Sequence, residues 1–477
     1  MFTPALGKSK PANEREDRHA ITSDELPSMT TPGDGVSSRS SVGEPSTGKK
    51  VVWGWALYDF GNSAFFTVIL TFTYAVFFAE EIVPDGTIGS VVWATGVTVS
   101  GLIVAVSSPF LGALADRGGH RRRYLFITTA VAVLGTALLY FPTPGEVRLA
   151  LVIFVIANVA AELASGVFYN SYLPEISTPD NIGKISGYGW SLGYLGGLLV
   201  LGITLVGFVF PDSPWFGLST GEEGLFQNIR ATTVVAAVWF AVFAIPMFLW
   251  VPEPEHPRAP PLGELLRGTV SQLGNTFKHI QRYGQIARLL FARMIYNDGL
   301  GIIFAIGVIY TVEVFGFTIT QAMMFGLAIN VTAGLGAFAM GFLDDRIGGK
   351  KTILISLVGL TLAVLWATLA PAESTTSLYM AGLAIGIFMG PNQAASRSLL
   401  GRFVPQEKET EFYGFFAFSG KATAFLGPTI YGVMTTAFGN PRYGVGAIMV
   451  FFLVGGLILA TVDEAAGVAA SGRASAS

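Results

Sequence analysis

Long apolar stretches separated by short polar segments make up most of the chain between residues 51 and 463. A membrane-spanning helix needs about 20 mostly apolar residues in a row. About twelve stretches meet this requirement, and we number them helices 1 to 12. They lie near residues 52–79, 88–112, 123–142, 147–171, 185–210, 231–251, 287–314, 320–343, 351–371, 375–399, 411–438 and 442–462. The pattern predicts an all-α integral membrane protein.

Polar segments predict how the chain is organised around these helices. Residues 1–50 are rich in Ser, Thr, Pro, Gly and charge, which predicts a disordered cytoplasmic tail. Residues 252–286 separate a six-helix half at 51–251 from a second at 287–463, and a short cytoplasmic tail follows at 464–477. The separating segment has apolar residues at helical spacing, so we expect an amphipathic helix along the bilayer surface.

Lys and Arg are distributed unevenly between the loops. They gather in the N-terminal tail and in the even-numbered loops, whereas the odd-numbered loops hold only Arg148, Arg230 and Arg442. Because positive charge stays on the cytoplasmic side, both termini are predicted to be cytoplasmic.

Composition agrees with a membrane protein and excludes several chemistries. The chain is 51% hydrophobic and only 13% charged, whereas soluble domains carry about 25% charged residues. It has 0 cysteines and 4 histidines, none of them at metal-ligand spacing. Phosphate-loop and dinucleotide-binding motifs are missing from the sequence. We therefore expect no enzyme, no cofactor, no metal and no nucleic-acid partner.

The two predicted halves resemble each other. "GALADRGGHRRR" at 112–123 follows helix 2, and "GFLDDRIGGKKT" at 341–352 follows helix 8. At one constant offset Pro174, Gly183, Gly189 and Gly196 match Pro405, Gly414, Gly420 and Gly427. At another, Tyr58, Asp59 and Gly61 match Tyr296, Asn297 and Gly299. Parallel six-helix repeats are one way to build an alternating-access carrier.

The loop between helices 2 and 3 resembles the signature loop of the major facilitator superfamily. It reads G-x-L-x-D-R-x-G-x-R-R-R, with a degenerate second copy between helices 8 and 9. Within that superfamily, "WALYDFGNSAFF" in helix 1 and "FYNSYLPEI" after helix 4 resemble the UMF1/Atg22-like branch. The resemblance implies a cytoplasmic gate formed by Gly112, Asp116, Arg117, Arg121, Gly341, Asp345 and Arg346. The alternative is that the basic residues only enforce topology.

Ionisable and amide side chains within the helices are costly in hydrocarbon and point to function. The resemblance implies that helices 1, 4, 7 and 10 line a central cavity and that helix 11 partly faces it. The predicted substrate and proton pathway consists of Asp59, Asn62, Ser63, Asn158, Glu162, Arg293, Asn297, Asp298, Asn392, Gln393 and Lys421. Such a polar set suits a small polar or zwitterionic solute.

For three of these charged residues we expect a specific role. Asp59 lies about 9 Å into helix 1 at 1.5 Å per residue, and a salt bridge with Arg293 of helix 7 would latch the halves. A static pair is the alternative. Glu162 lies deep in helix 4, where a carboxyl takes up a proton more readily, and is the candidate proton carrier. A fixed polar contact is the alternative for Glu162, and Lys421 would pair with an acid or bind a substrate carboxylate.

Two further features concern packing and the end of helix 10. Gly189, Gly193 and Gly197 form a glycine ridge on helix 5, which we expect to slide against helix 8, although ordinary close packing predicts the same glycines. Arg397 and Arg402 are long enough to reach the cytoplasmic interface.

Together these features predict a proton-coupled secondary transporter of a small polar solute, with an amino acid as the candidate. An exporter of lipophilic or cationic drugs is the nearest alternative, and a non-transporting receptor or scaffold is another. The expected partners are the lipid bilayer, the small-molecule substrate and protons, and the expected state is a monomer. Short loops favour a bacterial plasma membrane, although the fungal relatives of the branch are vacuolar.

Overall fold

The computed structural model describes residues 48–253 and 260–472. These residues fall within one contact unit, residues 45–477. The ordered elements among them are all helices, which confirms the predicted fold class. The predicted tail at residues 1–50 lies almost wholly outside the described residues.

The first helices contain several wide turns. Three of the long helices continue as the π-helical segments η1, η3 and η5, in which the wider turn shifts the face of the residues that follow. The elements are α1 (Lys49–Ala64), η1 (Phe65–Phe72), α2 (Thr73–Phe77), η2 (Phe78–Ile82), α3 (Gly86–Gly118), α4 (Arg121–Leu138), α5 (Val147–Leu163), η3 (Ala164–Tyr169), η4 (Asn170–Tyr172), α6 (Ile182–Thr204), η5 (Leu205–Val209), η6 (Trp215–Gly217) and α7 (Gln227–Trp250).

The later elements begin with the predicted amphipathic helix, which is α8. They are α8 (Leu262–Lys278), η7 (Ile280–Tyr283), α9 (Gly284–Phe315), α10 (Ile319–Ile347), α11 (Gly349–Leu369), α12 (Thr375–Phe403), η8 (Gln406–Lys408), α13 (Glu409–Lys421), α14 (Leu426–Phe438), α15 (Pro441–Gly446), α16 (Ile448–Ala460) and α17 (Glu464–Ala470). The predicted tail at 464–477 thus begins with a short helix.

Length and composition identify eight helices of the described residues that can each cross a membrane. The number becomes nine if the bent pair Gln281–Phe304 and Ile309–Phe315 is one span. The structure is therefore that of a multi-pass membrane protein. Twelve spans and cytoplasmic termini stay predictions.

Glycine and capping side chains make the turns around α10 tight. Gly316 ends α9 with a φ of 65°, the left-handed conformation that glycine adopts easily. The Thr318 hydroxyl accepts a hydrogen bond from the Gln321 backbone N–H, and the Gln321 side chain accepts one from the Thr318 N–H. Gly348, with a φ of 93°, lets α11 begin directly after α10. Consecutive helices are therefore joined by very short turns.

Buried apolar side chains form two separate clusters. One lies between Trp55 and Val251, and the other between Ile286 and Val462. We therefore call α1–α7 the N-terminal half and α9–α16 the C-terminal half. Because each half has its own core, a movement between them leaves both cores intact.

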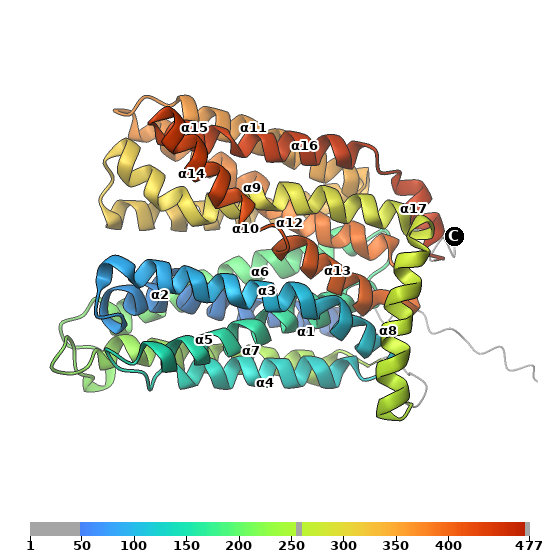
Figure 1. Cartoon of the computed structure of the whole chain (residues 1–477), viewed down its shortest axis with the longest axis horizontal. Helices are drawn as coiled ribbons and strands as arrows, with labels where there is room; N and C mark the ends of the chain where they lie inside the picture. The colour runs from blue at the N-terminus through green and yellow to red at the C-terminus, as the bar shows by residue number, and fades with distance from the viewer. Residues whose placement is uncertain (1–47, 254–259, 473–477) are drawn as a thin grey trace, which may run out of the picture. The chain divides into compact units, whose positions relative to one another are not determined.

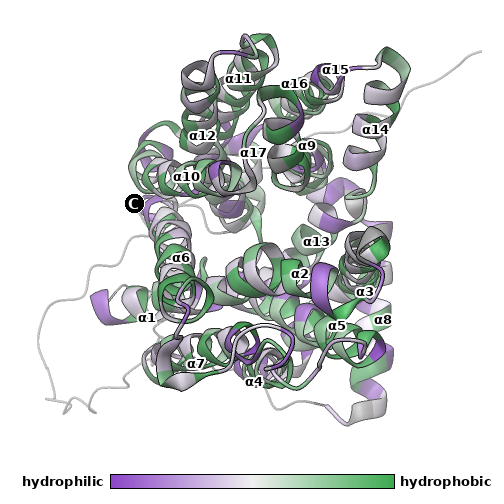
Figure 2. Ribbon diagram, turned by 90° about the vertical axis from the view of Figure 1, so that its left-hand side faces the viewer, coloured by the Kyte–Doolittle hydropathy of each residue, from purple (hydrophilic) through white to green (hydrophobic). Residues whose placement is uncertain are grey.

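α8 runs across one end of the long helices (Figure 1). We call this the α8 end, and the ends of α3 and α10 and the starts of α6 and α13 lie there. Figure 2 shows the helices nearly end-on from the opposite side, with α6 beside α10 where the halves meet. The halves also meet where α3 packs against α13.

Candidate functional site

A buried carboxylate at the end of α3 joins the halves where α3 meets α13. Asp116 accepts hydrogen bonds from the backbone N–H groups of Thr410 at 3.0 Å and Glu411 at 2.7 Å. These N–H groups belong to the first turn of α13, where a negative charge also meets the positive end of the helix dipole. Gly112 permits the approach, because a Cβ there would lie 2.2 Å from the Thr410 carbonyl oxygen.

Arg121 strengthens this junction through three carboxylates. Its Nη1 lies 2.8 Å from Oε1 of Glu175 and 3.0 Å from Oε2 of Glu409, and its Nη2 lies 3.5 Å from Oδ1 of Asp116. Glu409 belongs to the C-terminal half, so this ion pair also crosses between the halves. We call Asp116, Arg121, Glu409 and the Thr410–Glu411 backbone the first latch.

α8 is fastened to the first latch. The fully buried Glu411 carboxylate accepts hydrogen bonds from Gln272 Nε2 at 2.6 Å and Thr276 Oγ1 at 2.5 Å. Lys408 Nζ lies 3.6 Å from the same carboxylate. Nearer the start of α8, the buried Leu265 lies beside Gly118 at the end of α3. The helix predicted to lie on the bilayer surface therefore also connects the two halves.

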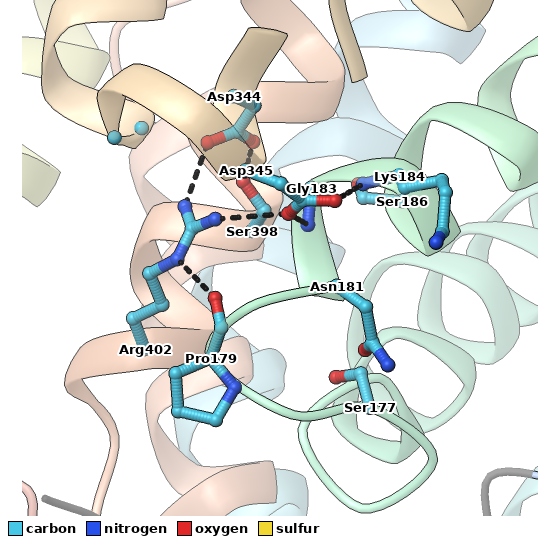
Figure 3. Close-up of polar contacts among 12 residues, drawn as sticks. Ser177, Pro179, Asn181, Gly183, Lys184, Ser186, Asp344, Asp345, Ser398 and Arg402 are labelled. Carbon is cyan, nitrogen blue, oxygen red and sulfur yellow. Dashed lines mark hydrogen bonds and ion pairs between the residues drawn. The ribbon is translucent and has the colours of Figure 1, made fainter. Parts of the chain in front are cut away.

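The repeated carboxylate at the end of α10 forms the equivalent junction. Asp345 accepts hydrogen bonds from the backbone N–H groups of Gly183 at 2.7 Å and Lys184 at 2.9 Å, in the first turn of α6. Figure 3 shows Asp344 and Asp345 both pointing toward Arg402 of α12, with Nη–carboxylate distances of 2.7 and 3.3 Å. We call these five residues the second latch.

The predicted gating residues divide into two groups. Asp116, Arg121 and Asp345 belong to the latches. Gly112 and Gly341 lie beside them where the helices of the two halves approach closely, and a Cβ on Gly341 would lie 3.0 Å from the Gly183 carbonyl oxygen. Arg117 and Arg346 are exposed, and neither forms an ion pair within the described part of the chain. The sequence interpretation missed Asp344, Glu409 and Arg402 as latch residues. Arg402 is buried within the second latch at the end of α12, and its predicted place at the cytoplasmic interface stays a prediction.

The predicted salt bridge between Asp59 and Arg293 is wrong. Asp59 Oδ2 instead lies 3.1 Å from Nη1 of Arg397, on α12 of the other half. The Arg397 guanidinium also donates to the hydroxyl and carbonyl oxygens of Ser186 and to Asn170 Oδ1. α1 begins at Lys49, so this pair lies about 15 Å along the helix at 1.5 Å per residue, deeper than predicted.

Aromatic rings surround the Arg397 guanidinium. Its central carbon lies 4.8 Å from the ring centroid of Trp55, 5.6 Å from that of Trp190 and 5.8 Å from that of Tyr169. Such contacts are attractive and strengthen when water is excluded, and Arg397 is only 3% exposed. The expectation that Arg397 reaches the interface is therefore wrong.

A second ion pair within the membrane also joins the halves. Lys421 Nζ on α13 lies 2.6 Å from Oε1 of Glu162 on α5. The two side chains are 32% and 14% exposed, so the pair is partly accessible. Lys421 therefore pairs with an acid, one of its two expected roles.

The helix 7 residues lie in the C-terminal half. Arg293 Nη1 donates to the Phe416 carbonyl oxygen at 2.8 Å and to Ser419 Oγ at 2.9 Å. Asn297 Nδ2 donates to the Gly420 carbonyl oxygen at 3.2 Å. Asp298 is buried in the same helix.

The neutral pathway residues are scattered along the bundle. Ser63 Oγ donates to the Asp59 carbonyl oxygen at 2.8 Å, and Asn158 Nδ2 donates to Ser100 Oγ at 2.6 Å. Gln393 Nε2 lies 3.5 Å from the Tyr194 hydroxyl. The amides of Asn62 and Asn392 are buried, and neither Asn392 amide atom has a hydrogen-bond partner among the described residues. The structure thus does not gather all predicted pathway residues into one cluster.

Two of the three ridge glycines, Gly193 and Gly197, pack within their own half, whereas Gly189 lies against Arg397 of the other half. Cβ atoms added to Gly193 and Gly197 would lie 2.9 Å from Ser63 Oγ and 2.4 Å from Thr67 Oγ1. Both partners belong to the first helix, so the expected contact of the ridge with helix 8 is wrong. α6 meets α10 through other positions, including Gly187, whose Cβ would lie 2.6 Å from the Ala337 carbonyl oxygen.

A family model described as "Vacuole effluxer Atg22 like" matches residues 83–471. The chain belongs to the Atg22-like family. The MFS-type transporter YxiO of Bacillus subtilis is 25% identical over 86% of this chain and 94% of the relative. Autophagy-related protein 22 of Coccidioides immitis is 22% identical over 77% of this chain and 72% of the relative.

Solved structures agree on the architecture. The major facilitator superfamily transporter FucP, in its outward conformation, matches with a TM-score of 0.68 at 12% identity, over 87% of this chain and 99% of FucP. At this identity the likeness shows the fold alone. The family match and the relative named as an MFS-type transporter, together with this fold, identify the Atg22-like chain as a major facilitator superfamily transporter.

Proposed function

We propose that this Atg22-like chain is a secondary transporter that moves a small polar solute by alternating access. The observation that carries the proposal is that three ion pairs connect the two halves. They are Asp59–Arg397, Glu162–Lys421 and Arg121–Glu409. The three pairs lie between bodies that have separate cores, so they can break and re-form as the halves move, provided that water reaches each charge when its pair opens.

The latches define the resting position of this movement. The two latches hold the halves together at the α8 end, and so do the contacts of α3 with α13 and of α6 with α10. This conformation is therefore closed at that end. We propose that the α8 end is cytoplasmic and that the halves open it by separating α3 from α13 and α6 from α10. The gating role of both latches follows from this movement.

The solute is proposed to be polar, with an amino acid as the candidate. Charged and amide groups lie on α1, α5, α9, α12 and α13, whereas a carrier of lipophilic drugs needs more apolar wall. The family description, a vacuole effluxer, is compatible with export of a small solute.

Proton coupling is proposed through Glu162. Protonation would neutralise its carboxylate and weaken the 2.6 Å pair with Lys421, which would ease separation of the halves. The partly accessible position of the pair gives protons a route to it. With the bacterial relative covering most of the chain, we also propose a bacterial plasma membrane and a monomeric carrier.

Reconstituted protein in liposomes tests the proposal. Uptake of each labelled amino acid is measured with and without an imposed pH gradient, and Glu162→Gln is compared with the wild type. We expect uptake of at least one amino acid, stimulated by the gradient only in the wild type. Uptake that ignores the gradient would remove proton coupling, uptake of lipophilic dyes alone would favour the drug exporter, and no uptake of any solute would favour a receptor or scaffold.

A further inference from the structure

The internal repeat places two equivalent positions deep in the two halves. Asp59 of α1 corresponds to Asn297 of α9, and Gly189 of α6 corresponds to Gly420 of α13. The helices at both positions pack alike. In the N-terminal half α6 lies against α1, and in the C-terminal half α13 lies against α9. The two positions can therefore be compared residue by residue.

In the N-terminal half the position holds a compensated positive charge. A Cβ on Gly189 would lie 2.8 Å from Nη2 of Arg397 and 2.9 Å from Oδ2 of Asp59. The missing side chain makes room for the guanidinium, and the Asp59 carboxylate balances its charge at 3.1 Å. The site is neutral overall.

In the C-terminal half the position again holds a guanidinium. A Cβ on Gly420 would lie 2.9 Å from Nη1 of Arg293. The residue at the place of Asp59 is now the neutral Asn297, whose amide donates to the Gly420 carbonyl oxygen. The Phe416 ring lies 3.6 Å from the central carbon of the guanidinium. A guanidinium therefore lies against the glycine at both positions, although Arg397 comes from α12 of the opposite half and Arg293 from α9 of the same half, and only Arg397 has an acid beside it.

Arg293 has no counter-ion within the described residues. Its Nη1 donates to a carbonyl and a hydroxyl oxygen, which carry no net charge. No described carboxylate lies within ion-pair distance, and this includes Asp298 of the same helix. By contrast, Arg397 and Lys421 within the membrane are each paired with an acid.

An uncompensated guanidinium at this depth is expensive. A charged side chain at the centre of a membrane helix costs about 2.5–3.5 kcal/mol or more, and such residues usually mark a substrate or ion pathway. The fork of N–H groups on arginine matches the two oxygens of a carboxylate. Arg293 is only partly buried, and Nε and Nη2 have no acceptor among the described residues.

We propose that Arg293 binds the carboxylate of the transported solute, which takes the place in the C-terminal half that Asp59 has in the N-terminal half. This inference rests on the proposed carrier function and narrows its substrate to solutes with a carboxylate. Binding would make the C-terminal position neutral, as the N-terminal one already is. The Asn297 amide lies beside the bound group.

The test compares carboxylates with their neutral analogues on purified full-length protein. Stabilisation against heat is titrated with each amino acid, with the amide of each amino acid that binds, and with neutral sugars. Losing a hydrogen-bonded charge contact weakens binding by about 10- to 100-fold. We expect Arg293→Gln to weaken amino-acid binding by this factor and to abolish the preference over the amide, with Arg293→Lys intermediate.

A second variant, Asn297→Asp, keeps the inference falsifiable if Arg293→Gln does not fold, and a third variant, Arg288→Gln, is the control. Asn297→Asp restores the acid that the repeat has lost, so it should occupy the guanidinium and weaken carboxylate binding as strongly. Arg288→Gln removes an exposed arginine of the same helix and should change nothing. Unchanged carboxylate binding in both Arg293→Gln and Asn297→Asp would overturn the inference.

The inference and the carrier function fail in different ways. A wild type that binds and transports sugars but no carboxylate would overturn the role of Arg293 and leave the carrier intact. A wild type that binds carboxylates through Arg293 but transports nothing in liposomes would overturn the carrier function alone.

Discussion

The geometry of the first latch allows the change in the open-to-closed ratio of the α8 end to be predicted for one substitution. Asp116→Asn keeps the shape of the side chain but removes its charge. In the wild type the Asp116 carboxylate accepts two backbone hydrogen bonds across the halves, at 3.0 and 2.7 Å. Asparagine has one acceptor oxygen, so one bond is lost and the other becomes a neutral one.

The size of the effect follows from these two bonds. A hydrogen bond to a charged group contributes about 1.5–3 kcal/mol, and a neutral one about 0.5–1.5 kcal/mol. Two charged bonds are replaced by one neutral bond, a loss of about 2.5–4.5 kcal/mol. The latch is present only when the α8 end is closed, so this loss falls on that state. At 1.4 kcal/mol per factor of ten, the open-to-closed ratio should rise by about 60- to 1,500-fold.

Distance measurements between spin labels can detect this shift. The chain has 0 cysteines, so labels at Arg123→Cys and Glu407→Cys react without background. Both positions are exposed at the α8 end, one in each half. We expect Asp116→Asn to move population from a short to a long distance, and the exposed Asp212→Asn to leave the distribution unchanged. A distribution identical to that of the wild type in Asp116→Asn would refute the role of this carboxylate.

Further predictions concern the other links. Asp59→Asn leaves Arg397 buried without its counter-ion, which costs about 3–5 kcal/mol, so the melting temperature of the purified protein should fall clearly; an unchanged melting temperature would contradict a stabilising pair. Asp345→Asn should open the α8 end as Asp116→Asn does, because it also removes a carboxylate from two backbone N–H groups; the same spin labels report it. Glu411→Gln weakens the anchoring of α8, so hydrogen exchange in residues 262–278 should speed up, whereas the exposed Glu264→Gln in the same helix should not change it.

Much of the architecture could be predicted from the sequence. Apolar stretches predicted the helices, because spanning a membrane sets both their length and their composition. The repeated loop motif identified Asp116 and Asp345, and both carboxylates bind the first turn of a helix in the opposite half. This part is predictable because a short motif at a helix end has few possible partners.

Pairing within the bundle could not be predicted. The sequence suggested Arg293 as the partner of Asp59, but the partner is Arg397, which enters the space that Gly189 leaves free. The rotation of each helix about its axis decides such pairs, and that rotation depends on how all the helices of the bundle pack together. The glycine ridge was assigned to the wrong neighbour for the same reason.

The unmatched residues of the repeat were more informative than the matched ones. Asn297 in place of Asp59 leaves the Arg293 guanidinium without an acid among the described residues, a difference that the sequence shows but only the structure explains. Asp344, which corresponds to Ala115, similarly adds an ion pair with Arg402 to the second latch alone.

Separation of the halves during transport is the central claim, and a reversible cross-link tests it most directly. A Cβ on Gly166 of η3 would lie 3.6 Å from Cβ of Ala417 on α13, within the range of about 3.5–4.5 Å for a disulfide. Gly166→Cys with Ala417→Cys should therefore form one bond between the halves, which mass spectrometry of the linked peptides can verify. We predict that oxidation stops uptake of the solute that the wild type transports and that reduction restores it. Full uptake by the oxidised, cross-linked protein would contradict alternating access by rocking of these halves.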